Sequence, residues 1–179
     1  MIYTINILGL WGSSMGGGHV ISIGGMNQKE GKIKCIVSQL GMMISSDLLN
    51  HVRAPNKNEM ETIDAGRANG TSNQPLPQDL CDMLRDLDGY PNLSKLNKYR
   101  PIDYAAMISV PTLILEASDE ELWDRTKHGE TVYKIIQKNE VPAKYGLLKG
   151  THYDGYATNG SQIEGCSQAI AWFKLHLLG

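Results

Sequence analysis

The sequence has few cysteines and no long apolar stretch, and both absences limit the class of protein. Its three cysteines, Cys35, Cys81 and Cys166, are far apart, odd in number and outside any CxxC spacing. Neither a disulfide framework nor a zinc cluster is therefore indicated. No run approaches the roughly 18 apolar residues of a membrane-spanning helix, and the amino terminus lacks a basic segment followed by an apolar core. We expect a cytoplasmic protein without a metal site or a membrane partner.

The chain also lacks a strong excess of charge of one sign. It has 17 Lys and Arg against 19 Asp and Glu, a net charge of −2, and the charges are interspersed. Nucleic acids and anionic membranes attract strongly basic proteins, so neither is an expected partner. A length of 179 residues, of which 41% are hydrophobic and 20% charged, is typical of one soluble globular domain over 1–179.

What the sequence does contain is a glycine-rich turn directly after an apolar stretch near its start. Gly12-Ser13-Ser14-Met15-Gly16 fits the pattern GxSxG, a sharp strand-to-helix turn that holds a serine in a strained backbone conformation. Glycines stand on either side because a Cβ there would collide with the neighbouring strand and helix. In this frame the nucleophile is Ser14, and Ser13 is excluded.

Strand and helix signals alternate along most of the chain. Strands are predicted over residues 2–11, 33–39, 110–117 and 143–148, and helices over 15–26, about 124–139 and about 161–178. On the last helix one apolar stripe is typical of a face packed against a core; it consists of Ile163, Cys166, Ile170, Phe173 and Leu177. The βαβαβαβα order predicts an α/β fold with a parallel sheet of about four strands and helices on both faces.

Residues 41–109 interrupt this alternation. The segment is too long for a loop and has no strand signal, so we expect a helical, lid-like insertion over the carboxyl edge of the sheet, with short helices around 58–68 and 78–88. Its apolar residues either wall an acyl pocket or anchor the insertion to the core, and anchoring is the favoured interpretation. They are Met42, Met43, Leu48, Leu49, Leu80, Met83, Leu84 and Leu87.

A serine hydroxyl needs a base within hydrogen-bond reach to act as a nucleophile at neutral pH. His152 lies just beyond the fourth predicted strand and before the last helix, where a loop can bring its ring over Ser14. The other four histidines, at positions 19, 51, 128 and 176, fall within helices or the insertion. We expect surface or packing roles for them.

The base in turn needs an acid to orient it, and four carboxylates crowd the turn after the third predicted strand. This turn reads Ser118-Asp-Glu-Glu-Leu-Trp-Asp124. Asp124 suits a cap for the following helix, whose first turn favours negative charge. Asp119 and Glu120 remain as candidates for orienting His152, and sequence spacing alone does not select between them.

Three segments together resemble the α/β-hydrolase family, in particular its esterase-like and dienelactone-hydrolase-like branches. They are 9–19, which holds the glycine-rich turn, 110–123, which holds the acidic turn, and 150–156, which holds His152. The order serine, acid, histidine matches that family. In such proteins the acid stands about three residues after the small residue that ends its strand. If Ala117 is that residue, the resemblance implies Glu120 as the acid and leaves Asp119 as the second candidate.

The resemblance implies covalent acyl transfer on esters of small acyl groups, with neither cofactor nor metal. Ser14 would attack the ester carbonyl, His152 would move the proton, and the backbone N–H of Met15 would bind the oxyanion. The family's second oxyanion donor follows an earlier strand that has no counterpart in this sequence. An alternative interpretation is therefore a catalytically degenerate hydrolase-like module that serves as an oligomeric or partner-binding scaffold.

The same resemblance bears on assembly. In the complete fold the strand that leads to the nucleophile is central, whereas the strand from Ile2 to Trp11 would have no neighbour on one side. Its unpaired backbone groups would be open to another chain. We therefore expect a homo-oligomer, most simply a two-fold dimer formed through this edge.

Overall fold

The computed structural model describes residues 8–26, 31–49, 57–58, 61, 65, 93–157 and 159–177. The chain divides into two units, Met1–Ile44 with Arg100–Gly179, and Ser45–Tyr99. In the second unit, α2 (Ser45–Leu49) and α4 (Leu93–Leu96) are described, and the Ser45 hydroxyl donates to the Tyr99 carbonyl at 2.8 Å and to that of Leu96. The helices predicted around 58–68 and 78–88 lie almost entirely outside the described residues.

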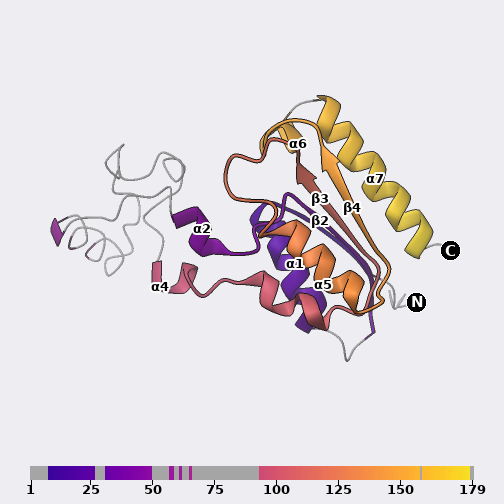
Figure 1. The fold of residues 1–179 in the computed structure, drawn as a ribbon, viewed down its shortest axis with the longest axis horizontal. Helices are drawn as coiled ribbons and strands as arrows, with labels where there is room; N and C mark the ends of the chain where they lie inside the picture. Colours follow the sequence, from indigo (N-terminus) through magenta and orange to yellow (C-terminus); the bar gives the residue numbers. More distant parts are fainter. Residues whose placement is uncertain are drawn as a thin grey trace, which may run out of the picture. The chain divides into compact units, whose positions relative to one another are not determined.

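The first unit contains the predicted sheet. Four parallel strands lie in the order β1-β2-β3-β4 (Figure 1). They are β1 (Leu8–Ser13), β2 (Ile33–Gln39), β3 (Thr112–Ala117) and β4 (Ala143–Leu148). This confirms the predicted α/β fold, and β2 and β4 have the predicted bounds.

The other two strands differ at their ends. β3 begins two residues later than predicted, because Pro111 has no N–H to donate to the ladder, although its carbonyl still accepts a bond from Ile36 N at 2.9 Å. The described part of β1 continues to Ser13, beyond the predicted end at Trp11. The start predicted for this strand, at residue 2, lies outside the described residues.

Helices cover both faces of the sheet, as predicted. On one face lie α1 (Met15–Met26), the 3-10 helix η1 (Pro101–Met107) and α5 (Gly129–Lys138), and on the other lies α7 (Asn159–Leu177). Side chains alternate along the strands, so that Ile36 and Ile114 face the first group while Val37 and Leu115 face α7. Burial on both faces explains why these strands are almost continuously apolar.

The glycines of α1 would weaken an isolated helix, yet two of them allow it to pack closely. A Cβ at Gly24 would lie 2.2 Å from Ile36 Cδ1, and one at Gly25 would lie 2.4 Å from the Tyr104 carbonyl oxygen. The helix therefore approaches β2 and η1 more closely than a side chain would permit. Its bounds, Met15–Met26, are the predicted ones.

The helix after β3 begins at Gly129 and not at Asp124, so the predicted start is wrong. The Asp124 carboxylate accepts bonds from Thr126 N at 3.0 Å and Thr126 Oγ1 at 2.6 Å. Asp124 thus closes a local turn, because a short carboxylate competes for the backbone two residues ahead. The N-cap position of α5 is occupied by His128, which makes no capping side-chain bond, so the helix-capping role predicted for Asp124 is also wrong.

The buried face of α7 differs from the predicted apolar stripe. Ile163 is 63% exposed and Ile170 is 51% exposed. The buried residues are Ser161, Gly165, Ala169 and Trp172. Small residues allow the helix axis to approach the sheet, and this close packing decides the face that α7 presents. A short helix, α6 (Asp154–Ala157), precedes α7 and was not predicted.

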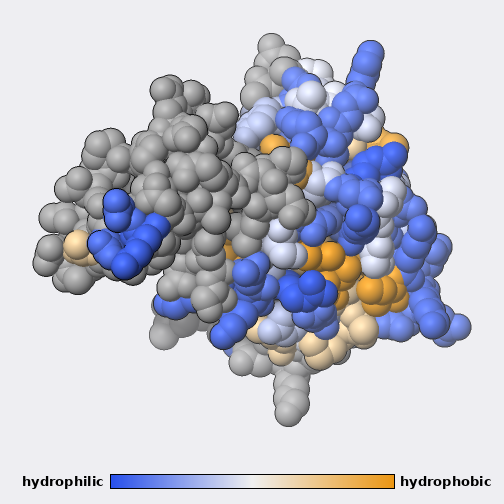
Figure 2. Space-filling model, turned by 60° about the vertical axis from the view of Figure 1, so that its left-hand side comes forward, coloured by the Kyte–Doolittle hydropathy of each residue, from blue (hydrophilic) through white to orange (hydrophobic). Residues whose placement is uncertain are grey.

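The surface of the molecule is mixed. Figure 2 shows that hydrophobic residues visible on one side gather mainly in one area among hydrophilic ones. On β1, Leu8 and Trp11 are more than two fifths exposed. Within the described residues, no helix combines the length and apolar character that crossing a membrane requires.

Candidate active site

The turn between β1 and α1 has the strained geometry that its sequence predicts. Ser14 has a φ of 54°, in the left-handed region that non-glycine residues rarely adopt. Such a conformation costs about 1–3 kcal/mol. Bonds from Ser14 N to the Gln39 carbonyl at 2.9 Å and from Met42 N to the Ser14 carbonyl at 3.1 Å oppose this cost. A Cβ at Gly12 would lie 2.1 Å from the Gly16 carbonyl oxygen, so the turn requires glycine there. The collision predicted at Gly16 is wrong, because a Cβ there would meet no described atom within 4 Å.

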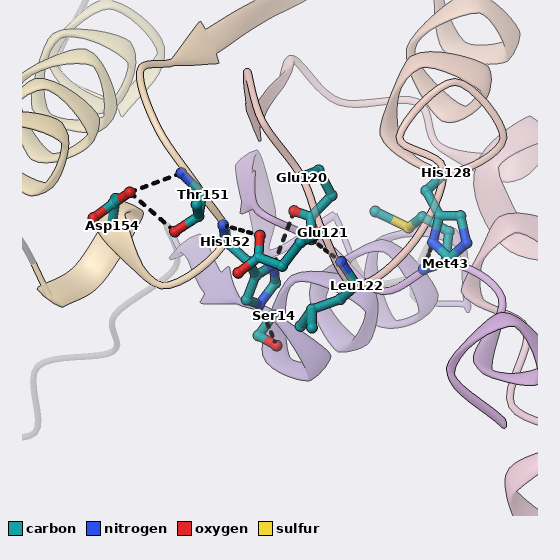
Figure 3. A network of polar contacts seen from close by, with 9 residues as sticks. All are labelled: Ser14, Met43, Glu120, Glu121, Leu122, His128, Thr151, His152 and Asp154. Atoms are coloured by element: carbon teal, nitrogen blue, oxygen red, sulfur yellow. Dashed lines mark hydrogen bonds and ion pairs between the residues drawn. The ribbon is translucent and has the colours of Figure 1, made fainter. Parts of the chain in front are cut away.

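Three side chains from three loops meet at the carboxyl end of the sheet. Ser14 Oγ lies 3.0 Å from His152 Nε2, and His152 Nδ1 lies 2.9 Å from Glu120 Oε2 (Figure 3). The side chains of His152 and Glu120 are 0% and 1% exposed. A carboxylate at Nδ1 holds the proton on that nitrogen and leaves Nε2 to accept the serine proton. The contacts form a continuous path from a carboxylate through an imidazole to a hydroxyl.

Asp119, the second candidate acid, has other partners. Its carboxylate accepts a bond from the Ser118 hydroxyl at 2.9 Å, and its backbone N–H donates to the Gly150 carbonyl at 2.9 Å. The residue is exposed. The structure therefore brings Ser14, Glu120 and His152 together, whereas the Asp119 carboxylate binds the neighbouring Ser118 hydroxyl.

No family model matches the chain. The sequence is similar to two curated Escherichia coli proteins, each described as an uncharacterized 31.7 kDa protein in the traX-finO intergenic region. Each is 26% identical to it over 193 residues, which cover 95% of this chain and 65% of the relative. The chain thus spans slightly less than two thirds of the curated relatives it matches.

Solved structures resemble the chain over nearly its whole length. Pyrococcus horikoshii acylaminoacyl peptidase matches 96% of this chain and 24% of its own, with a TM-score of 0.61 and 13% identity. The esterase domain of a Rhodothermus marinus protein matches 94% of this chain and 61% of its own, at 0.56 and 14%. Paleococcus ferrophilus monoacylglycerol lipase matches 93% and 68%, at 0.57 and 14%. The chain has the α/β-hydrolase fold.

In this α/β-hydrolase fold, aromatic rings surround the histidine. The Trp123 ring meets the His152 ring edge-on at 4.8 Å and stacks on His128 at 5.2 Å. His128 is fully buried and its Nδ1 accepts a bond from Met43 N at 3.0 Å. His128 therefore packs, as expected for the histidines other than His152. The Tyr156 ring also meets the His152 ring edge-on, at 5.7 Å, and burial raises the pKa of the Tyr156 hydroxyl to about 12.

The remaining predicted residues have varied positions. Met15 is the first residue of α1, directly after Ser14, and N–H groups at a helix amino end carry partial positive charge.

The other histidines differ in their surroundings. His19 is exposed on α1, His176 packs against Trp172 with ring centroids 4.2 Å apart, and His51 lies outside the described residues. Met42 and Met43 are buried in the first unit. No side chains are described for the other candidate pocket residues, at positions 48, 49, 80, 83, 84 and 87.

The described residues contain no group of three or more His, Cys, Asp or Glu arranged to hold a metal ion.

One buried carboxyl group near the site was not predicted from the sequence. Glu116 is fully buried on β3, and neither carboxyl oxygen has a hydrogen bond of acceptable geometry. Burial raises the pKa of this carboxyl well above its usual value, and Glu120 adds to the effect. The Arg125 charge and the Gly129 backbone N–H lower the pKa, but by less.

We expect the Glu116→Gln substitution to stabilise the protein increasingly as pH rises. Because the folded state raises the pKa of Glu116, its protonated form is favoured fully below the unfolded value of 4.5, and that stability is lost as pH increases through the folded value. Glutamine cannot ionise, so its profile should be flatter. Urea unfolding of both proteins at about pH 5, 7 and 9 measures the difference.

Other ionisable side chains surround Glu116, so only the difference in unfolding free energy between the two proteins isolates its contribution. These groups are Glu120, Arg125, Glu130 and Tyr145. All four are present in both proteins. Parallel profiles for wild type and Glu116→Gln would contradict the expectation of a proton held on Glu116.

Proposed function

We propose that this protein is a serine hydrolase that cleaves carboxylic esters of small acyl groups. The observation that carries the proposal is the unbroken contact from Glu120 through His152 to Ser14, with distances of 2.9 and 3.0 Å. A scaffold without catalysis needs neither this alignment nor a strained serine. The named activities of the solved structures with this fold, a peptidase, an esterase domain and a lipase, are compatible with it.

The chemistry follows from the contacts. His152 Nε2 takes the Ser14 proton as Oγ attacks the ester carbonyl, and Glu120 stabilises the resulting imidazolium through the Nδ1–H bond. The oxyanion of the tetrahedral intermediate is bound by the Met15 N–H at the amino end of α1. Collapse expels the alcohol, which takes its proton from His152. Water activated by the same ring then attacks the acyl-serine and releases the acid.

Esters are the favoured substrates because an alcohol leaves more readily than an amine, so an ester demands less stabilisation of the transition state. The test is hydrolysis of p-nitrophenyl acetate, butyrate and octanoate, with the reaction quenched early for mass spectrometry. We expect turnover of the shorter esters and an acyl group on the peptide that contains Ser14. Product release without any acylated Ser14 peptide would contradict the covalent mechanism.

We also propose that a second copy of the chain covers the outer edge of β1. β1 has β2 as a neighbour and no strand on its other side among the described residues, and Leu8 and Trp11 are 41% and 43% exposed. Strand edges with exposed apolar side chains favour association. Light scattering at micromolar concentration should give the mass of two chains, and Trp11→Lys should reduce it. A wild-type mass of one chain would contradict this proposal.

A further inference from the structure

The loops after β3 and β4 are joined by hydrogen bonds where they leave the sheet. Ser118 N donates to the Leu148 carbonyl at 2.8 Å, and Asp119 N donates to the Gly150 carbonyl at 2.9 Å. Gly150 N donates in return to the Ser118 hydroxyl at 3.0 Å. These bonds fix the β4 loop as far as residue 150. Beyond that point the chain turns at Gly150, whose φ is +108°.

The next link between the two loops is made by a carboxylate. Glu121 Oε2 accepts a hydrogen bond from the backbone N–H of His152 at 2.7 Å. The adjacent Glu120 binds the ring of the same histidine. Two consecutive glutamates therefore hold one residue, Glu120 through its imidazole and Glu121 through its backbone, and both bonds are visible in Figure 3.

The backbone of the acidic turn explains how neighbouring side chains reach the same residue. Glu120 Oε1 accepts a bond from Leu122 N at 3.1 Å, two residues ahead. This bond closes a local turn at Glu120 and Glu121, from which one carboxylate reaches the His152 ring and the other its backbone N–H. On the other side of His152, the Asp154 carboxylate accepts bonds from Thr151 N at 2.8 Å and Thr151 Oγ1 at 2.9 Å. That contact lies within the β4 loop and does not tie it to the acidic turn.

We propose that Glu121 is a positioning residue that holds the backbone of His152, and thereby its ring, in register with Ser14 and Glu120. This inference rests on the proposed hydrolase function. A bond from N–H to a charged acceptor is stronger than one between neutral groups. Glu121 is exposed, so water can replace its carboxylate when it is removed, and the fold should survive. What is lost is the fixed orientation of the imidazole, on which proton transfer depends.

We expect the Glu121→Ala substitution to lower kcat for p-nitrophenyl acetate roughly tenfold with little change in KM. Glu121→Gln keeps an oxygen acceptor of the same length and should recover most of the lost kcat. Glu164→Ala is the matched control, because Glu164 is an exposed acid on α7 whose carboxylate accepts a bond from Gln168. It should behave like wild type.

A second readout does not depend on turnover. The proton between His152 Nδ1 and Glu120 should give a low-field proton NMR resonance, and in Glu121→Ala it should broaden as the ring exchanges faster with solvent. If Ser14→Ala hydrolysed esters as wild type does, the proposed function would fail, yet this resonance would still test Glu121. Wild-type kcat with an unchanged resonance in Glu121→Ala would overturn the inference, as would a Glu121→Gln variant as slow as Glu121→Ala.

Discussion

Replacing Ser14 with alanine is expected to reduce ester hydrolysis by about 10⁶-fold, the largest loss that any single substitution in this chain should cause. The covalent route requires an oxygen nucleophile 3.0 Å from His152 Nε2, and alanine has none. Binding and the oxyanion donor would remain, which leaves a residual rate roughly 10³- to 10⁴-fold above that of water. Steady-state hydrolysis of p-nitrophenyl butyrate by purified protein measures the effect.

Ser13→Ala is the matched control, since it removes the same hydroxyl one residue earlier, at the end of β1. We expect it to retain most of the wild-type rate. Alanine at position 14 removes the hydroxyl and leaves the backbone at the same positive φ of 54°. We therefore expect both variants to keep the fold. Equal rates in wild type and Ser14→Ala would favour the scaffold interpretation over the esterase.

The second large effect concerns the two neighbouring acids. Glu120→Gln is expected to lower kcat about 10⁴-fold. An amide in place of this carboxylate, 2.9 Å from His152 Nδ1, neither stabilises the imidazolium nor selects the productive tautomer. Because the Glu120 side chain is 1% exposed, little water is available to replace it. Hydrolysis rates measured over a range of pH values report the loss.

Asp119→Asn is the comparison that makes this result specific. Its carboxylate accepts a bond from the Ser118 hydroxyl and is not in contact with His152 in the hydrogen bonds described. An asparagine oxygen can accept the same bond, so we expect a change in kcat of less than about threefold. A loss in Asp119→Asn equal to that in Glu120→Gln would mean that the acid of the site had been misassigned.

Much of the fold could be predicted because the relevant signals are local. β2, β4 and α1 have the predicted bounds, and each depends on a contiguous run of apolar or turn-forming residues. Ser14 and His152 could also be chosen, since the GxSxG turn and a loop after the last strand are properties of short segments. The start of α5 could not be predicted, because the carboxylate of Asp124 closes a turn through Thr126 and not the helix.

The packing of helices against the sheet was harder to predict from the sequence. The apolar periodicity of the last helix favoured a stripe through Ile163 and Ile170, but the face that meets the sheet contains Gly165 and Ala169. Depth of packing, and not hydrophobicity alone, decides such a choice. Glu116 shows the same limit, because an acidic residue within an apolar strand gives no sign of whether it is buried.

The sequence by itself determined the kinds of groups at the site and their order along the chain, since a serine in a strained glycine turn, an acidic turn and a histidine loop are each encoded by neighbouring residues. Only the tertiary structure showed that Glu120, and not Asp119, bonds to the His152 ring among the described contacts, and that Glu121 binds the His152 backbone. The directions of adjacent side chains depend on hydrogen bonds between loops more than 25 residues apart in sequence, such as Glu121 and His152, whose separation is 31. No local pattern encodes that register.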